Sequence, residues 1–265
     1  MNRLAAWAAI AFLALLALVA LAPGIIAPVD PLAVNPGEAF TPPGAGHLFG
    51  TDESGRDVFS RVIHGSRDSL VIGLAATGLG MSLALVLGTV CAVSPTFIDT
   101  AILRLLEALY AIPTLLMALV IMTFAGRGTI PAIVAVGLST APGYGRMVRS
   151  QIIALRGSDM VEAAIVLGHA PVRIATNHLV PHALRSLLAL VTLGIGQAII
   201  WASALSFLGL GTPPPAPEWG AMLASGRTYL HFAWWMSVFP GLAIVIVAAT
   251  TTMLGRALGG RVHTV

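Results

Sequence analysis

One residue of this chain lies in a setting that suggests a nucleophile. Ser139 belongs to Gly137-Leu138-Ser139-Thr140, which loosely follows a GxSx pattern inside a long apolar stretch. A catalytic serine needs a base within hydrogen-bond reach, yet all seven histidines fall in loops or at the edges of apolar stretches. A serine that packs between helices is therefore favoured, and an intramembrane hydrolase is the alternative.

Other common catalytic patterns are missing from the sequence. All 14 basic residues are arginine, which excludes the GxxxxGK[ST] loop of nucleotide hydrolases. The HExxH pattern of zinc proteases is absent, and the single Cys91 allows neither an internal disulfide nor a thiolate metal cluster. We therefore expect no catalytic residue, no metal site and no cofactor in this chain.

The clearest local pattern lies in the charged segment between Arg146 and Arg185. Asp159 and Glu162 have capping-box spacing, Gly168 suits the left-handed position after a helix, and Pro171 suits the first turn of the next one. The spacing predicts two short helices joined by a turn. The first is too short to be stable alone in water, so it packs on its own membrane domain or on a separate cytoplasmic subunit, and the pattern favours neither.

The elements that position these residues follow from the scarcity of charge. The 265 residues include 14 basic and 11 acidic ones, whereas about a quarter of a soluble chain is charged. A soluble globule is excluded. Six windows without Asp, Glu, Lys or Arg reach the roughly 18 to 20 residues that cross a bilayer. They are Leu4–Val29, Ser69–Ile98, Ala108–Gly126, Gly128–Gly145, Ser186–Pro217 and Phe232–Gly255.

These windows predict an all-α, polytopic membrane protein with six transmembrane helices. We expect residues 1–27 to form the first transmembrane helix and residues 28–68 an extracytoplasmic loop with an interfacial helix. Residues 69–255 form the core with helices two to six, and residues 256–265 a cytoplasmic tail. The interfacial helix is expected because Ser54 and Asp57 have capping-box spacing before an apolar helical pattern; a solvated loop end is the alternative.

The arginines orient these helices. With the N-terminus inside, nine arginines fall on the cytoplasmic side and five outside, as the positive-inside rule requires. Both termini are then cytoplasmic. The alternative for the first window is a signal peptide cleaved after Ala20-Leu21-Ala22. The scattered arginines make no basic face, so we expect contact with membrane lipid and none with nucleic acid.

The last extracytoplasmic loop contains Pro213, Pro214, Pro215 and Pro217 and is therefore stiff. Trp219, Trp234 and Trp235 follow it, and we expect all three in an aromatic belt at the membrane interface. The transmembrane windows contain no acid that could couple transport to an ion gradient. A chain without its own energy source and with a helix pair facing the cytoplasm is typical of a pore-forming subunit worked by a partner.

Four motifs resemble those of binding-protein-dependent ABC importer permeases. Glu162-Ala163-Ala164 with Gly168 and His178-Leu179-Val180-Pro181 resembles their EAA loop. Three further motifs are similar to the C-type permease of the dipeptide, oligopeptide and nickel subfamily. They are Gly50-Thr51-Asp52 with Gly55-Arg56-Asp57; Tyr144 with Arg146 and Val148-Arg149; and Ser206–Gly211 leading to Pro217-Glu218-Trp219-Gly220.

The resemblance implies a type I permease fold in the bacterial cytoplasmic (inner) membrane. It also implies a second homologous permease as heterodimer partner, two ATP-binding subunits that hold ATP and magnesium, and an extracytoplasmic solute-binding protein. The coupling loop, residues 150–181, would dock on an ATP-binding subunit and act as a lever. The substrate expected is a di- or oligopeptide, and the alternative is nickel, a metal chelate or another small solute.

The resemblance assigns roles to individual residues. Coupling would involve Asp159, Glu162, Ala163, Ala164, Gly168, Pro171 and Pro181. Glu162 would hold the turn through hydrogen bonds to backbone N–H groups, and Gly168 would supply its positive φ. Contacts with the binding protein would come from Asp52, Arg56, Asp57, Glu218 and Trp219.

Overall fold

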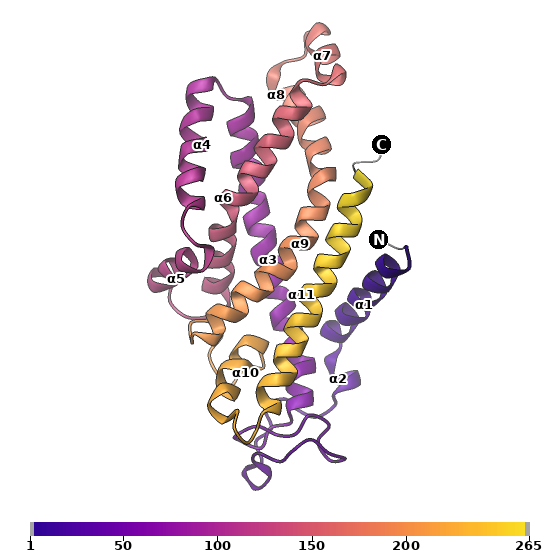
Figure 1. Cartoon of the computed structure of the whole chain (residues 1–265), viewed down its shortest axis with the longest axis vertical. Coiled ribbons are helices and arrows are strands. Elements are labelled where there is room, and N and C mark those ends of the chain that lie inside the picture. The colour runs from indigo at the N-terminus through magenta and orange to yellow at the C-terminus, as the bar shows by residue number, and fades with distance from the viewer. Residues whose placement is uncertain (1–2, 263–265) are drawn as a thin grey trace.

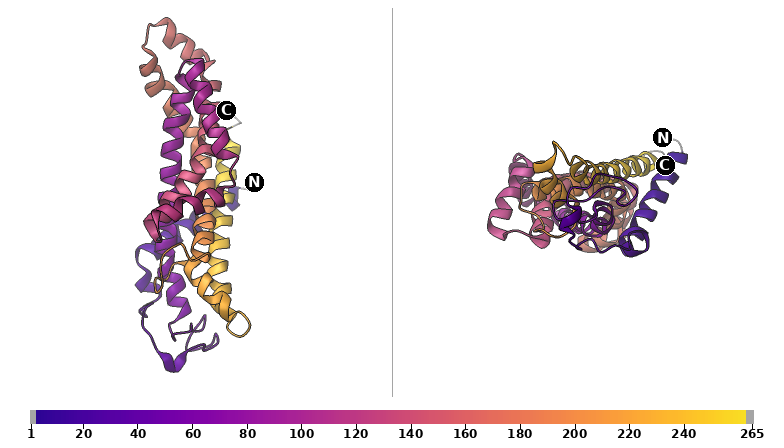
Figure 2. Two further views of the ribbon diagram at one scale, coloured as in Figure 1. Left: turned by 90° about the vertical axis from the view of Figure 1, so that its left-hand side faces the viewer. Right: turned by 90° about the horizontal axis from the view of Figure 1, so that it is seen from below.

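The computed structural model describes residues 3–262 and is helical over most of that range. Figure 1 shows an elongated bundle in which α3, α6, α9 and α11 run along the long axis. The short helices α7 and α8 lie at one end, and the segment between α2 and α3 lies at the other, as the side view in Figure 2 also shows. No strand occurs within residues 3–262, which confirms the all-α prediction.

The N-terminal elements lie on the outside of the bundle. Helix α1 (Arg3–Leu21) contacts α11 and α3, and α2 (Pro23–Ile26) begins with a proline, which suits a first helical turn. The chain then runs irregularly to residue 57, interrupted by the 3₁₀ turn η1 (Pro36–Glu38).

Helix α3 (Val58–Val93) corrects the expectation of a separate interfacial helix. The helix that begins after Asp57 continues without a break through the second predicted span, because no proline lies between Val58 and Val93. Its polar N-terminal end is held by the loops around it: Arg61 Nη1 donates to the carbonyls of Pro31 at 3.1 Å and Pro215 at 3.2 Å. Residues 58–68 are thus the largely buried N-terminal end of a long helix.

The third predicted span is bent rather than straight. Helix α4 (Thr96–Tyr110) and α5 (Thr114–Ala125) meet at 91°. Pro113 directly precedes α5, and the residue before a proline is disfavoured in helical conformation. The window Ala108–Gly126 was therefore wrong as a single straight helix, and α4 begins twelve residues earlier than that window.

Helix α6 (Thr129–Arg156) carries the fourth span beyond the predicted Gly145 and contains Pro142. It packs closely along α3, and Gly80 permits this close approach. A Cβ at Gly80 would lie only 2.9 Å from the Gly137 carbonyl oxygen. After α6 come α7 (Asp159–Val166), α8 (Pro171–Ile174) and the π-helical turn η2 (Ala175–Leu179).

The last helices complete the bundle. They are α9 (Val180–Phe207), α10 (Trp219–Gly226), the 3₁₀ turn η3 (Arg227–Tyr229) and α11 (Trp235–Val262). The tail predicted at 256–265 continues α11 as helix to Val262, and residues 263–265 lie outside the described range. In Figure 1, the segment that joins α2 to α3 lies at the bottom of the bundle and α7 at the top. The start of α1 and the end of α11 both lie above that segment, toward α7.

Three helices are long and apolar enough to cross a membrane within residues 3–262: Val58–Val93, Leu187–Phe207 and Trp235–Leu258. The bent pair α4–α5 makes a fourth crossing if it counts as one span, and Ala9–Leu21 is a shorter apolar helix. Each of the six predicted windows overlaps a helix, while their number as full crossings stays a prediction.

Candidate functional site

The first candidate region is the tip formed by α7 and α8. The N-cap of α7 is Ser158 rather than Asp159, and the Ser158 carbonyl accepts from the N–H groups of Val161 and Glu162 at 2.9 and 3.1 Å. The Glu162 carboxylate is exposed and has no hydrogen bond or ion pair to any described residue. The predicted hydrogen bonds from backbone N–H groups to Glu162 are therefore absent from residues 3–262.

The turn after α7 has the conformation that its sequence predicts. Gly168 has φ +75°, and its N–H donates to the Ile165 carbonyl at 2.9 Å while the His169 N–H donates to Ala164 at 3.1 Å. These two bonds form a Schellman motif, in which glycine avoids the steric cost of a left-handed residue. Pro171 begins α8 as predicted, although its side chain lies outside what the structure describes. Pro181 is exposed in the first turn of α9.

The two faces of the tip differ. Val161 and Ala164 are each only 3% exposed and pack in a cluster with Ile152 of α6. The opposite side, with Asp159 and Ala163, is exposed. Four large apolar side chains of the tip are also 60–81% exposed: Ile165, Val166, Leu167 and Val172. The short helix thus packs on its own domain with one face and leaves an apolar face uncovered.

At the opposite end of the molecule, Asp52, Arg56 and Asp57 are buried, at 4, 8 and 9% exposure. Arg56 Nε donates to Asp52 Oδ2 at 2.7 Å, and the Asp52 Oδ1 atom accepts from the Arg56 and Ser54 N–H groups. These buried side chains form no contact surface in this conformation, and their contact with a binding protein stays a prediction. They form ion pairs and turn hydrogen bonds within the chain, and these interactions shape the loop before α3.

Asp57 connects this loop to α3. Its Oδ2 atom accepts from the Ser60 N–H at 2.7 Å, so Asp57 is the N-cap of α3, whereas the predicted capping box would have made Ser54 the N-cap. Its Oδ1 atom lies 2.9 Å from His47 Nδ1, and His47 Nε2 lies 3.4 Å from Glu38 Oε2. The hydrogen bond to Asp57 raises the pKa of His47 above its ordinary value, against the opposing effect of burial.

Glu218 and Trp219 are also internal, each 1% exposed. Glu218 is the N-cap of α10 and accepts from the Gly220 and Ala221 N–H groups at 2.8 and 2.9 Å, while burial raises the pKa of its carboxyl. Trp219 Nε1 donates to the Val62 carbonyl at 2.9 Å. Neither residue can contact a binding protein in this conformation.

The aromatic-belt prediction is also wrong for two of the three tryptophans. Trp219 and Trp235 belong to the apolar core at this end, and Trp235 Nε1 donates to the Thr51 carbonyl at 2.9 Å. Trp234, at 48% exposure, alone of the three reaches the surface. The indoles act as bridges between distant segments because each N–H finds a backbone acceptor there.

An ion pair that sequence reasoning missed ties α4 to α6. Arg149 Nε and Nη2 donate to the two Asp99 carboxylate oxygens at 2.7 and 2.6 Å, and Cys91 Sγ lies 2.8 Å from Asp99 Oδ1. Fifty residues separate the two ends of the pair, so no local spacing indicates it. The motif with Tyr144, Arg146 and Arg149 contains the arginine of this ion pair, but no motif contained Asp99.

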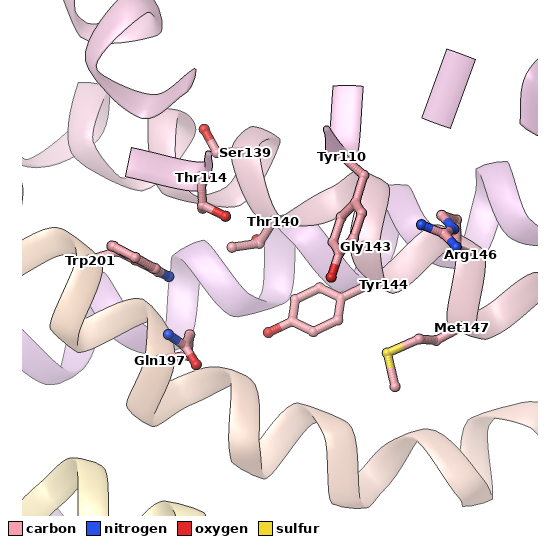
Figure 3. Close-up of a pocket in the computed structure, with 10 residues that line it drawn as sticks. All are labelled: Tyr110, Thr114, Ser139, Thr140, Gly143, Tyr144, Arg146, Met147, Gln197 and Trp201. Atoms are coloured by element: carbon pink, nitrogen blue, oxygen red, sulfur yellow. The ribbon is translucent and has the colours of Figure 1, made fainter. Parts of the chain in front are cut away.

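A cavity of about 400 Å³ lies between α4, α5, α6 and α9 and was also not anticipated. Figure 3 shows Arg146 and Trp201 toward its two ends, with the rings of Tyr110 and Tyr144 between them. Ser139, the only serine considered as a nucleophile, also lines this cavity, and its Oγ donates to the Ala135 carbonyl at 2.7 Å. No histidine or acid is among the ten lining residues, so Ser139 has no base there.

The long apolar helices, the exposed apolar side chains of the tip and a cavity between helices fit a helical membrane permease. The chain belongs to the family described as the inner membrane component of binding-protein-dependent transport systems, which matches residues 84–264. It is thus a multi-pass transport permease subunit.

Several relatives support this membership. The chain is 41% identical over 219 residues to a putative peptide transport system permease of Brucella suis, covering 83% of this chain and 74% of the relative. It is 36% identical to a di/tripeptide transport system permease of Pseudomonas aeruginosa, covering 93% and 84%. An inward-facing structure of the methionine ABC transporter MetNI shares the fold, with a TM-score of 0.61, 18% identity, and coverage of 75% and 96%.

Proposed function

We propose that this chain is a permease subunit of an ATP-driven importer that moves di- or oligopeptides across the bacterial cytoplasmic membrane by alternating access. The observation that carries the substrate class is the similarity, at 35 to 41% identity, to permeases named for peptide or dipeptide transport. Nickel or another metal chelate is the competing cargo.

In this proposal the α7–α8 tip docks on an ATP-binding subunit. Its uncovered apolar face, Ile165 to Leu167 with Val172, suits a groove on another protein better than water. Because Val161 and Ala164 fix the tip to α6, movement of the tip is transmitted to the helix that lines the cavity. ATP and magnesium are bound by the two ATP-binding subunits, and a second, homologous permease completes the pore.

The end of the molecule that carries the loop before α3 then faces outward, toward a solute-binding protein. Its internal ion pairs keep the loop in one shape, so exposed residues such as Leu48 and Val34 are presented on a rigid support. Both termini are cytoplasmic in this orientation.

Reconstitution tests the proposal directly. The complex of both permeases and the ATP-binding subunits is placed in liposomes with ATP inside, and the binding protein is added outside with labelled dipeptide or labelled nickel. We expect ATP-dependent and binding-protein-dependent accumulation of the dipeptide. Accumulation of nickel without dipeptide would replace the cargo and leave the importer assignment intact, whereas no import of either would overturn the function.

A further inference from the structure

The cavity between α4, α5, α6 and α9 contains a cation without a counter-ion. Arg146 lines the cavity, is exposed, and makes no hydrogen bond or ion pair with any residue in the described range. Its guanidinium carbon lies 5.1 Å from the centre of the Tyr110 ring, which orients the side chain without neutralising it. Other arginines of α4 and α6 do have partners, since Arg104 pairs with Glu107 and Arg149 with Asp99.

The rest of the cavity wall is uncharged and capable of hydrogen bonding. Tyr144, Gln197 and Trp201 line it, and their polar atoms bond to no other described residue. Thr140 and Ser139 donate to carbonyls of their own helix, which leaves their oxygens as acceptors toward the cavity. The wall thus offers one positive charge, several neutral hydrogen-bonding groups and aromatic faces.

We propose that this cavity is a weak peptide subsite of the translocation path in which the Arg146 guanidinium binds the terminal α-carboxylate. A guanidinium matches a carboxylate in geometry and charge. The neutral groups of Tyr144 and Gln197 suit the amide groups of a peptide, and the ring of Trp201 suits a side chain. This inference rests on the proposed peptide function and adds a chemical requirement to it.

The same wall predicts which end of the peptide is bound here. No acid is among the ten lining residues, so the cavity wall offers the Arg146 guanidinium as partner for a carboxylate but no counter-ion for a terminal ammonium group. We therefore expect binding to depend more on the carboxylate than on the charge of the amino end. This asymmetry separates a carboxylate subsite from a general polar channel.

Equilibrium binding to the assembled complex tests the proposal. The complex in nanodiscs, without the binding protein, is mixed with millimolar Ala-Phe, its C-terminal amide or N-acetyl-Ala-Phe, and contact is measured by saturation-transfer NMR. We expect contact with the two free acids and at least about tenfold weaker binding of the amide, the loss expected for one charge-assisted hydrogen bond. Equal binding of acid and amide would overturn the proposal.

Variants locate the effect. Arg146→Gln should bind all three peptides as weakly as the wild type binds the amide, and Arg146→Lys should retain part of the preference for the acid. Arg104→Gln is the matched control, since Arg104 is exposed on α4 and outside the cavity. An undiminished acid preference in Arg146→Gln would assign the arginine to a lipid phosphate or to the partner permease instead. If Arg146→Gln does not assemble, the proposal is tested by the binding of the free acid and of the amide to the wild type and to Arg146→Lys.

Import separates this inference from the function on which it rests. In proteoliposomes with saturating binding protein, Arg146→Gln should import fewer dipeptides for each ATP hydrolysed, with ATP hydrolysis itself retained. An equal fall in import and hydrolysis would indicate a structural role and contradict the subsite. If the wild-type complex imports no peptide, the proposed function fails, whereas peptide import with equal binding of acid and amide removes only the subsite.

Discussion

At the residue scale, residue type and spacing predicted local backbone conformation well. Gly168 was predicted in the left-handed position after a helix and has φ +75°. Burial, by contrast, could not be predicted from spacing. Asp52, Arg56 and Glu218 have charges that favour a surface position, yet their partners come from turns and caps that exist only in the folded chain.

Replacing Gly168 tests the lever at this scale. Gly168→Val places a β-branched residue at positive φ, which costs about 1 to 2 kcal/mol or forces the turn to change. We expect the assembled complex to hydrolyse ATP while peptide import falls about tenfold or more. Import measured together with ATP hydrolysis in proteoliposomes checks this.

Gly209→Val is the matched control for that variant. Gly209 has φ +80° and ends α9 with the same pair of hydrogen bonds, and at both glycines a Cβ would meet no atom within 4 Å. The backbone cost is therefore similar at the two sites, but Gly209 lies away from the tip. Equal loss of import in both variants would mean that general destabilisation, and not the lever, explains the result.

His47 predicts a pH dependence of stability. Asp57 and Glu38 face its ring, and the hydrogen bond to Asp57 raises the pKa of His47 above 6.5 in the folded state. The folded state then binds the proton more tightly than the unfolded state. The stabilisation is fully present below pH 6.5 and is lost as the pH rises through the raised value.

Thermal unfolding of the purified complex between about pH 5.5 and about pH 8.5 measures this effect. His47→Gln should remove this component of the pH dependence. His231→Gln, at an exposed residue without a hydrogen bond in the described range, should behave as the wild type does. A pH profile unchanged by His47→Gln would contradict the assignment.

At the element scale, charge-free windows located the long helices but not their breaks and continuations. The window ending at Gly126 was bent by 91° at Pro113, while Pro142 lies inside α6 without ending it. A proline costs a helical hydrogen bond in either place, and only packing decides whether the helix continues. Helix α6 packs on α3 and α9 and continues past Pro142 to Arg156.

The Asp99–Arg149 ion pair joins α4 to α6, and its removal is expected to lower the stability of the chain. Both side chains are 21% exposed and share two hydrogen bonds, so removing either charge should destabilise the chain by about 1.5 to 3 kcal/mol. Asp99→Asn, Arg149→Gln and the double variant form a cycle, and we expect the double variant to lose less than the sum of the single ones. Denaturation of the complex in mild detergent measures each value.

The exposed pair of Arg104 and Glu107 provides the comparison. These side chains are 78% and 36% exposed and make one bond of 3.0 Å. An exposed pair contributes about 0 to 1 kcal/mol, so Glu107→Gln should change stability little. Additive losses in the first cycle would show that Asp99 and Arg149 do not act as a pair.

At the scale of the whole molecule, motifs spread over the chain were enough to predict membership in a transport family. They did not predict how the helices come together in space. The cavity combines residues of α4, α5, α6 and α9, and no short sequence pattern joins these elements. The tip and the loop before α3, which the sequence predicts on opposite sides of the membrane, lie at opposite ends of the bundle in Figures 1 and 2. Which end faces the cytoplasm is a prediction that rests on the arginine distribution alone.

Cysteine labelling tests this orientation in the intact complex. Cys91 is the only cysteine in the sequence, and Cys91→Ser gives a background whose hydroxyl can still donate to Asp99. Val166→Cys at the tip and Leu48→Cys in the outer loop then place single thiols at positions that are 81% and 63% exposed. A membrane-impermeant maleimide should label Leu48→Cys in intact cells or right-side-out vesicles, and Val166→Cys only in inverted vesicles.

Partner protection completes that experiment, because each partner covers one end. The ATP-binding subunits should slow labelling of Val166→Cys, since the apolar face around it is removed from water on docking. The binding protein should slow labelling of Leu48→Cys and leave Val166→Cys unaffected. Labelling of Val166→Cys from the outside would reverse the orientation, and unprotected labelling in the full complex would show that the tip does not dock, so that α7 would have to move α6 by contacts within this chain alone.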